Sequence, residues 1–214
     1  TDRIGGLFLT ASAMSFKEND KALITWYENE VKKAGLDIRF NTEINDLGIL
    51  RGYDEIIVAT GAVPRKMLIP GCEKYPVGDK VVFFGGGQSA CEAAYEMVLQ
   101  GKHPIIVEYA KDLVPAQNVC LSNASFLRDV LEYHKVPTYL EHTIREIKDK
   151  TVVIASKDGK NVFEVEYDNI VNGIGFVPAP VGGKGKNIHR VGDCVTIGNL
   201  RTAIWRAWDV CMKI

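Results

Sequence analysis

The sequence predicts an α/β protein built on parallel strands, and three observations support this. Residues 81–94 read VVFFGGGQSACEAA, in which large apolar residues are followed by three glycines and an alanine-rich stretch. A second apolar run, PIIVEYA at 104–110, comes next. Strand, glycine turn, helix and strand within roughly 30 residues form a βαβ unit, whose strands run parallel through a right-handed crossover. The third observation is DEIIVATG at 54–61, a short apolar run ending in glycine, which is typical of a buried parallel strand.

The remaining elements follow from periodicity. Residues 20–34 carry apolar side chains at helical spacing, and 36–44 (LDIRFNTEI) alternate as a strand. Helices are expected at 89–100 and at 122–135, the second capped by Ser122 or Asn123. Four strands then follow without helices, which predicts an antiparallel meander ending in a core strand: 142–147, 151–156, 161–167 and 169–175. A strand at 187–193 and a helix at 199–214 complete the chain.

Composition narrows the function classes. The chain has 214 residues, 46% of them apolar and 25% charged, as in an ordinary soluble globular protein. Its net charge of −1 gives no field that would recruit nucleic acid or a membrane. No apolar run reaches the ~20 residues of a membrane span, and the start lacks the pattern of a secretory signal. We therefore expect a cytoplasmic protein with no nucleic-acid or membrane partner.

The cysteines indicate free thiols. There are five, an odd number, and none are spaced C-x-x-C: Cys72, Cys91, Cys120, Cys194 and Cys211. This favours a reducing compartment and argues against a dithiol redox centre. No histidine and cysteine grouping has metal-ligand spacing, so no metal site is expected.

The glycine turn matches the dinucleotide fingerprint as Gly85-x-Gly87-x-x-Ala90. The first glycine makes the tight turn, the second lets a pyrophosphate approach the backbone, and Ala90 allows close packing of helix on strand. Gly86 lies between them, and the helix opening at Gln88 and Ser89 offers unpaired N–H groups to phosphate. A purely structural turn is the alternative.

The position of Glu108 supports the interpretation of the glycine turn as a dinucleotide-binding turn. It lies 23 residues after Gly85, at the end of the next strand, where an acid accepts bonds from the adenosine ribose hydroxyls. An acid there repels a 2′-phosphate, and no arginine follows immediately, although Lys111 is near. The sequence therefore predicts binding of NAD, with NADH favoured over NADPH.

Two further segments fit a second nucleotide. IIVATGAVPR at 56–65 is a strand ending in Ala-Thr-Gly, and HRVGDC at 189–194 is a strand ending in Gly-Asp. Each alone is more typical of a routine loop. Their order around a βαβ unit favours nucleotide binding.

These motifs resemble one family along the whole chain. IGGLF, VATGAVPR, GGGQSA, GIGFVP and VGDCVTIGNLRTAIWRAWDV are similar to the carboxy-terminal FAD/NAD(P)-binding region of the 2-enoate reductase and 2,4-dienoyl-CoA reductase family. These NADH:flavin oxidoreductases are related to Old Yellow Enzyme, and the last segment most resembles the clostridial 2-enoate reductases.

The resemblance implies a fold with two dinucleotide-binding domains, Rossmann-like and of the glutathione reductase type. Residues 66–176 would form the NAD(P)-binding domain, and 1–65 plus 177–214 a discontinuous FAD-binding domain. In the family the FAD domain starts with its own strand, glycine turn and helix, whereas this chain opens at TDRIGG, past them. We therefore expect an N-terminally truncated FAD domain that binds FAD poorly and that either self-associates or has mobile parts.

The site residues carried over from the family are of two kinds. Gly173 and Gly175 would border the nicotinamide nucleotide. The FAD set comprises turn glycines, the ribityl-binding Asp193 and N–H groups at the start of the last helix that would face the flavin: Gly6, Thr60, Gly61, Gly192, Asp193, Arg201 and Thr202. No side chain here is expected to act as a catalytic acid or base.

The resemblance also implies an activity of the longer protein. Hydride would pass from NADH to FAD, and electrons would pass through [4Fe–4S] to FMN, which reduces an activated C=C bond. FMN and the cluster would lie in an absent TIM-barrel domain of the same polypeptide, so the fragment alone would be inactive. Two alternatives stay open: the reductase half of a two-component electron-transfer flavoprotein, and a non-catalytic ADP-binding interaction module.

Overall fold

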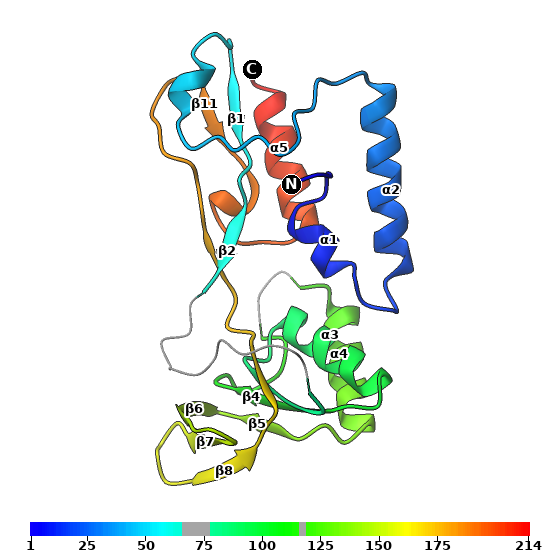
Figure 1. Cartoon of the computed structure of the whole chain (residues 1–214), viewed down its shortest axis with the longest axis vertical. Coiled ribbons are helices and arrows are strands. Elements are labelled where there is room, and N and C mark those ends of the chain that lie inside the picture. Colours follow the sequence, from blue (N-terminus) through cyan, green and yellow to red (C-terminus); the bar gives the residue numbers. More distant parts are fainter. Residues whose placement is uncertain (66–77, 116–118) are drawn as a thin grey trace. The chain divides into compact units, whose positions relative to one another are not determined.

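The computed structural model describes residues 1–65, 78–115 and 119–214 (Figure 1). The chain divides into two compact units, which we describe separately. The central unit comprises residues 64–175, and the terminal unit comprises residues 1–63 together with 176–214. Cys72 lies outside the described residues.

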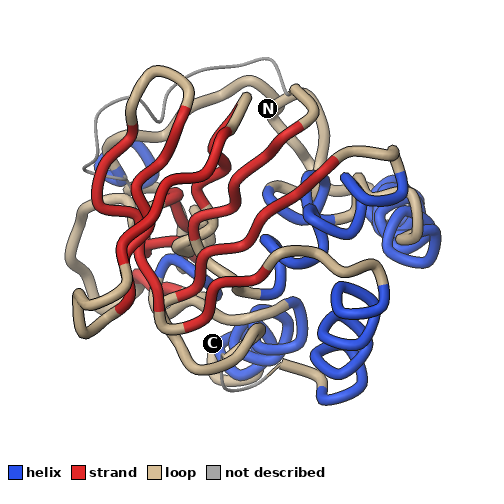
Figure 2. Tube along the Cα trace, turned by 90° about the horizontal axis from the view of Figure 1, so that it is seen from below, coloured by secondary structure: helices blue, strands red, loops and turns tan. Residues whose placement is uncertain are grey.

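The central unit is built on a four-stranded sheet with the order β5-β4-β3-β9. All neighbouring strands of this sheet run parallel. Figure 2 draws the strands of the chain as red tubes and its helices in blue. The strands are β3 (Lys80–Phe84), β4 (His103–Glu108), β5 (Thr138–Leu140) and β9 (Asn169–Asn172). Helix α3 (Gln88–Leu99) connects β3 to β4, and this confirms the predicted βαβ unit.

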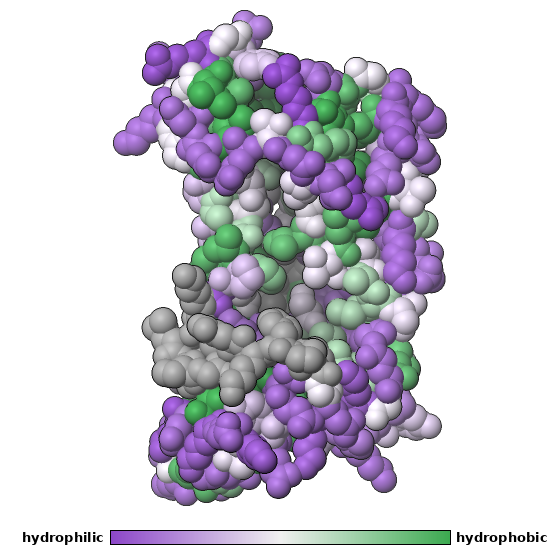
Figure 3. All heavy atoms as spheres, in the orientation of Figure 1, coloured by the Kyte–Doolittle hydropathy of each residue, from purple (hydrophilic) through white to green (hydrophobic). Residues whose placement is uncertain are grey.

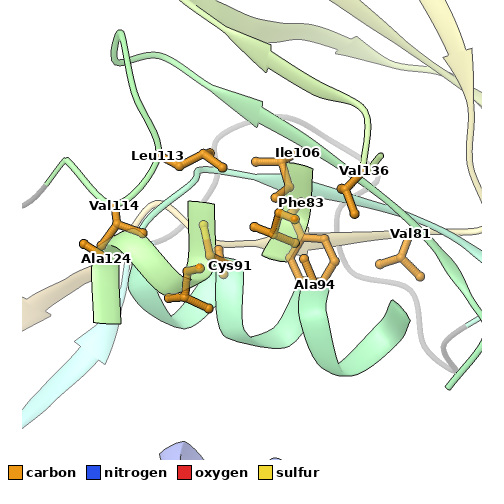
Figure 4. Close-up of a cluster of buried hydrophobic side chains, with 12 residues drawn as sticks. Val81, Phe83, Cys91, Ala94, Ile106, Leu113, Val114, Ala124 and Val136 are labelled. Carbon is orange, nitrogen blue, oxygen red and sulfur yellow. The ribbon is translucent and has the colours of Figure 1, made fainter. Parts of the chain in front are cut away.

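Two helices cover one face of this sheet. Because side chains alternate along a strand, Val81 and Phe83 of β3 point to the face where α3 and α4 (Leu121–Tyr133) pack. Figure 4 shows Phe83, Ile106, Cys91 and Ala94 gathered between the strands and the helix. Phe83, Cys91, Ala94 and Ile106 are fully buried, so this face has a closed core.

A meander covers the opposite face. Strands β6 (His142–Ile147), β7 (Thr151–Ser156) and β8 (Val162–Glu166) pair antiparallel, and β9 then enters the parallel sheet. Val82 and Val107 pack against Ile144, Val152 and Ile154. The predicted meander ending in a core strand is therefore confirmed.

The terminal unit has only short strands among its described residues. β1 (Ile56–Val58) pairs parallel with β11 (Ile188–Arg190), and β2 (Ala62–Pro64) pairs with β10 (Phe176–Pro178). Its helical elements are α1 (Leu7–Ala11), α2 (Glu18–Lys33), η1 (Leu47–Leu50), η2 (Gly192–Cys194) and α5 (Leu200–Cys211). A small cluster forms its core, with Leu47, Ile56, Val58 and Cys194 buried.

Large apolar side chains remain at the surface of the terminal unit. Trp26 is 52% exposed, Trp205 61% and Trp208 58%. Figure 3 shows apolar residues, coloured green, on the visible face of this unit in the upper half of the view. Helix α5 has no buried residue at all. No helix within the described ranges is both long and apolar enough to cross a membrane.

Two sequence predictions are wrong. Residues 36–44 form no strand, since Leu36, Ile38 and Phe40 lie exposed and Asn41 turns the chain with φ +52°. Alternation alone supplies no hydrogen-bonding neighbour, and a strand needs one. The N-cap of α4 is Cys120, not Ser122 or Asn123. The short elements α1, β2, β5 and β10 gave no periodic signal and were not expected.

Candidate nucleotide-binding site

The glycine turn lies at the carboxyl end of β3, beside the carboxyl end of β9. Gly85 has φ +110°, a conformation that favours glycine, and a Cβ there would lie 2.5 Å from the carbonyl oxygen of Gly173. A Cβ at Gly173 would in turn lie 2.8 Å from Cβ of Ala90. The fold itself therefore requires both glycines, and Ala90 is the largest side chain that fits opposite them.

Gly86 is also required by its surroundings. A Cβ at this position would lie 2.6 Å from Cδ2 of Leu113 and 3.1 Å from Cβ of Glu108. Its N–H donates to Oε2 of Glu108 at 2.5 Å, and its carbonyl accepts from the N–H of Val114 at 2.7 Å. Gly86 thus packs against the end of β4 at Glu108.

Gly87 differs from the other two. Its φ of −69° and ψ of 170° are open to any residue, and a Cβ there would meet no atom of the described residues within 4 Å. It is the N-cap of α3, and the N–H groups of Gln88 and Ser89 have no partner inside the helix. Because the first turn has no acidic residue, no side chain of that turn neutralises the partial positive charge at this helix end.

Glu108 ends β4 beside this turn. Its Oε2 accepts from Gly86, and its Oε1 accepts from the N–H of Ala110 at 2.5 Å. These two hydrogen bonds hold the half-buried side chain in place. Because a carboxylate has about four acceptor positions, Glu108 can still accept hydrogen bonds from a ligand.

Two side chains on α3 complete the surroundings of the turn. Glu92 is 7% exposed and accepts a hydrogen bond from Nε2 of Gln88 at 3.0 Å. Sequence reasoning missed it, although a lone acid within the apolar run ACEAA was a signal. Burial, with the charge of Glu108 as a lesser cause, raises the pKa of Cys91 to about 12. Cys91 is therefore a neutral thiol that donates to the carbonyl of Gly86, not a redox nucleophile.

The terminal unit gathers part of the predicted FAD set. Thr60 and Gly61 follow β1, and Gly192 and Asp193 follow β11, so the parallel pairing places all four at one edge. The Thr60 hydroxyl donates to the carbonyl of Ala179 at 2.8 Å. Asp193 Oδ1 accepts from the N–H of Gly198 at 3.0 Å. These bonds shape the loops, while Gly61 (φ +73°) leaves open space at its Cβ position.

The start of α5 lies next to η2. Asn199 caps this helix and accepts the N–H of Thr202 at 3.0 Å. The Thr202 N–H is thus already used, and the N–H groups of Leu200 and Arg201 are those without a partner inside the helix. Arg206 ties the helix to the preceding loop by donating to the carbonyls of Gly192 and Thr196.

In the described part of the chain, no hydrogen bond joins Gly6 or Gly175 to these groups. Gly6 caps the five-residue α1, and no hydrogen bond in the described part of the chain joins it to the rest of the FAD set. Gly175 has φ +91° with open space at its Cβ position, and its carbonyl accepts from the N–H of Arg65 at 2.9 Å.

The residues present fit the two nucleotides unequally. The central unit offers a turn, a helix end and an acid for a dinucleotide. In the described ranges the terminal unit offers the edge of β1 and β11 but no second glycine turn leading into a long helix for the FAD pyrophosphate. Within the same ranges no cluster of three or more possible metal ligands occurs.

A parallel sheet with a glycine turn and an acid closing the next strand defines an α/β protein of the dinucleotide-binding, Rossmann-like class. Residues 51–211 match the model of the pyridine nucleotide-disulphide oxidoreductase family, and the chain belongs to this family. The described cysteines are free, two buried and two exposed.

Relatives support the resemblance seen in the sequence. The chain is 29% identical to cinnamate reductase of Clostridium sporogenes, over 99% of this chain and 34% of that protein. It is 25% identical to NADH oxidase of Thermoanaerobacter brockii, over 99% of this chain and 36% of that protein. The chain thus spans about a third of the length of these relatives, and its expected kinship with the clostridial 2-enoate reductase group is confirmed.

Solved structures agree on the fold. A 2-naphthoyl-CoA reductase complex superposes with a TM-score of 0.87 at 26% identity, covering 100% of this chain and 35% of that one. Thioredoxin reductase of T. acidophilum superposes with a TM-score of 0.74, covering 99% of this chain and 86% of that one. At 15% identity the second likeness shows the fold alone. The predicted glutathione reductase-like fold class is confirmed.

Proposed function

We propose that the central unit binds NADH, with the pyrophosphate at the start of α3 and the adenosine ribose at Glu108. The chain would then be the nucleotide-binding portion of a flavin-dependent reductase. One observation carries the proposal: no contact within the described part of the chain requires position 87 to be a glycine.

The three glycines of the turn differ in the space available for a side chain. Gly85 and Gly86 have neighbours at 2.5 and 2.6 Å from a notional Cβ, so the fold explains them. Gly87 has no such neighbour among the described residues, and its φ is ordinary. A ligand that must approach the backbone at this point explains the missing side chain, and the free N–H groups of Gln88 and Ser89 suit a pyrophosphate.

Glu108 supports NADH as the nucleotide. Its carboxylate is anchored by two main-chain N–H groups and retains acceptor capacity for the ribose hydroxyls. A 2′-phosphate in the same place would bring like charges together, which disfavours NADPH.

The names of the relatives support a reaction for the longer protein. Cinnamate reductase and 2-naphthoyl-CoA reductase are named as reductases, and a flavin bound near NADH would accept its hydride and pass electrons on. The acceptor would be an activated C=C bond, reduced in a barrel domain that holds FMN and [4Fe–4S] outside this chain. The alternative is that the chain is the reductase half of a two-component electron-transfer system. The similarity to an NADH oxidase supports this alternative.

The test compares two alanine substitutions in one turn. The methyl group of Gly87→Ala would meet no atom of the described residues, and φ stays in an allowed region. The free energy of unfolding should therefore change by less than about 1 kcal/mol. NADH affinity should fall at least tenfold, because the methyl group would stand where the pyrophosphate lies. Isothermal titration and thermal unfolding of both proteins measure this.

Gly85→Ala is the matched control. It should destabilise the chain by about 3 kcal/mol or more, because φ is positive and a carbonyl oxygen blocks the Cβ. Unchanged NADH affinity in the stable Gly87→Ala variant would refute the proposed function.

A further inference from the structure

The residue that follows Glu108 in the chain carries an exposed aromatic ring with a cation over it. Tyr109 follows Glu108 in the chain, and 60% of its surface is exposed. The Nζ atom of Lys157 lies 4.0 Å from the centroid of its ring. Neither residue has a role in the site described above.

Main-chain hydrogen bonds bring Lys157 to this place. The N–H of Glu141 donates to the carbonyl of Ala110 at 2.9 Å, and the N–H of Lys157 donates to the carbonyl of Glu141 at 2.8 Å. The segment after β4 is thus tied, through Glu141, to the turn that follows β7. The position of the Lys157 backbone is therefore fixed relative to the end of β4, and only its side chain needs to move.

We propose that Lys157 is a specificity-determining residue, held by Tyr109, that offers its ammonium to the 2′-phosphate of NADPH. This inference rests on the proposed function, because it takes the adenosine ribose to lie at Glu108. The turn after β7, which belongs to the meander, would then contribute to the choice between NADH and NADPH.

Charge explains why this residue matters. Glu108 alone would place a carboxylate against a 2′-phosphate and exclude NADPH strongly. A lysine ammonium is a mobile point charge on a flexible stem, and a cation–π contact at an exposed site is weak enough to be exchanged for a phosphate. Lys157 therefore offsets the effect of Glu108, and the preference for NADH over NADPH should be modest.

The first experiment removes the charge at one of two lysines in the same turn. Lys157→Gln is compared with Lys160→Gln, whose side chain is 85% exposed and pairs with Asp158. Both variants lose one positive charge from the same surface. We expect Lys157→Gln to weaken NADPH about fivefold with NADH within twofold, as for one partly exposed charge contact. Lys160→Gln should change neither affinity.

Further variants separate charge from packing. Lys157→Arg should restore NADPH affinity, and Tyr109→Phe, which keeps the ring, should resemble the unaltered chain. Tyr109→Leu should weaken NADPH more than NADH, because the ammonium loses its support. The NADPH effect should shrink as salt rises from 0.05 to 0.5 M, since screening acts on exposed charges.

The outcomes distinguish this inference from the proposed function. If the unaltered chain binds neither nucleotide, the proposed function fails and this inference with it. If NADH binds but Lys157→Gln leaves the ratio of NADPH to NADH affinity unchanged, only this inference is overturned. Equal weakening of both nucleotides would also overturn it, because Lys157 would then be a structural residue.

Discussion

The two units of this chain place their predicted nucleotide-binding residues on very different supports. In the central unit, four parallel strands have helices on one face and a meander on the other, and Phe83, Ile106 and Val107 are fully buried. In the terminal unit, β1 and β11 form a two-stranded sheet and Trp208 is 58% exposed. The predicted FAD residues therefore lie on strands with fewer buried neighbours than the strands that hold the glycine turn.

The difference in strand support between the two units is clearest at β1. Among the described residues β11 is its only partner, and the side chain between the two buried ones, Ile57, is 41% exposed. Parallel sheets are normally covered on both faces. The two strands pair directly with each other, so any further strand would lie beside them and not between them.

The largest expected effect comes from equivalent truncations in the two units. Phe83→Ala should cost about 3–5 kcal/mol of unfolding free energy, because it empties a fully buried position. Trp208→Ala should cost less than about 1 kcal/mol, because its ring is largely in solvent. Urea unfolding of both variants measures this. Comparable losses would show that the terminal unit is as well packed as the central one.

The sequence predicts those features that have local signals and misses those that depend on tertiary contacts. The βαβ unit and the meander were predictable because their strands and turns carry local signals, such as the three glycines before α3. The strand expected at 36–44 failed because pairing is a tertiary property. The contact of Lys157 with Tyr109 was not predictable, since it depends on how a turn of the meander packs beside the end of β4.

A second prediction concerns self-association through the terminal unit. Exposed apolar faces and an open strand edge favour pairing with another chain. We expect the unaltered chain to gain mass with concentration in sedimentation experiments. Trp205→Glu combined with Trp208→Glu should lower that tendency.

Tyr133→Glu is the matched control. Tyr133 is an 80% exposed aromatic on α4 of the central unit, and its substitution should leave association unchanged. A monodisperse monomer at all concentrations of the unaltered chain would contradict this account of the terminal unit.

The smallest expected effect is a pH dependence in the central unit. The Asp168 carboxylate accepts the N–H groups of Lys80 and Asp79, which lowers its pKa from the ordinary 3.8. Since the folded pKa is the lower one, its stabilising contribution is present above the unfolded pKa and is lost as pH falls through the folded value.

Asp168→Asn isolates this contribution. The variant should lose less stability than the unaltered chain when the pH falls below about 4. Thermal unfolding between pH 3 and 7 measures the difference. Parallel curves for the two proteins would contradict the assignment.

Hydrogen exchange of the whole chain, with NADH and with FAD added separately, tests most directly the claim that only the central unit has a complete site. NADH should slow exchange at residues 85–89 and 108–110. FAD should leave 59–61 and 191–202 unchanged, and the protein should not retain stoichiometric yellow colour. Strong protection of the terminal unit by FAD, with no protection of the glycine turn by NADH, would contradict the account.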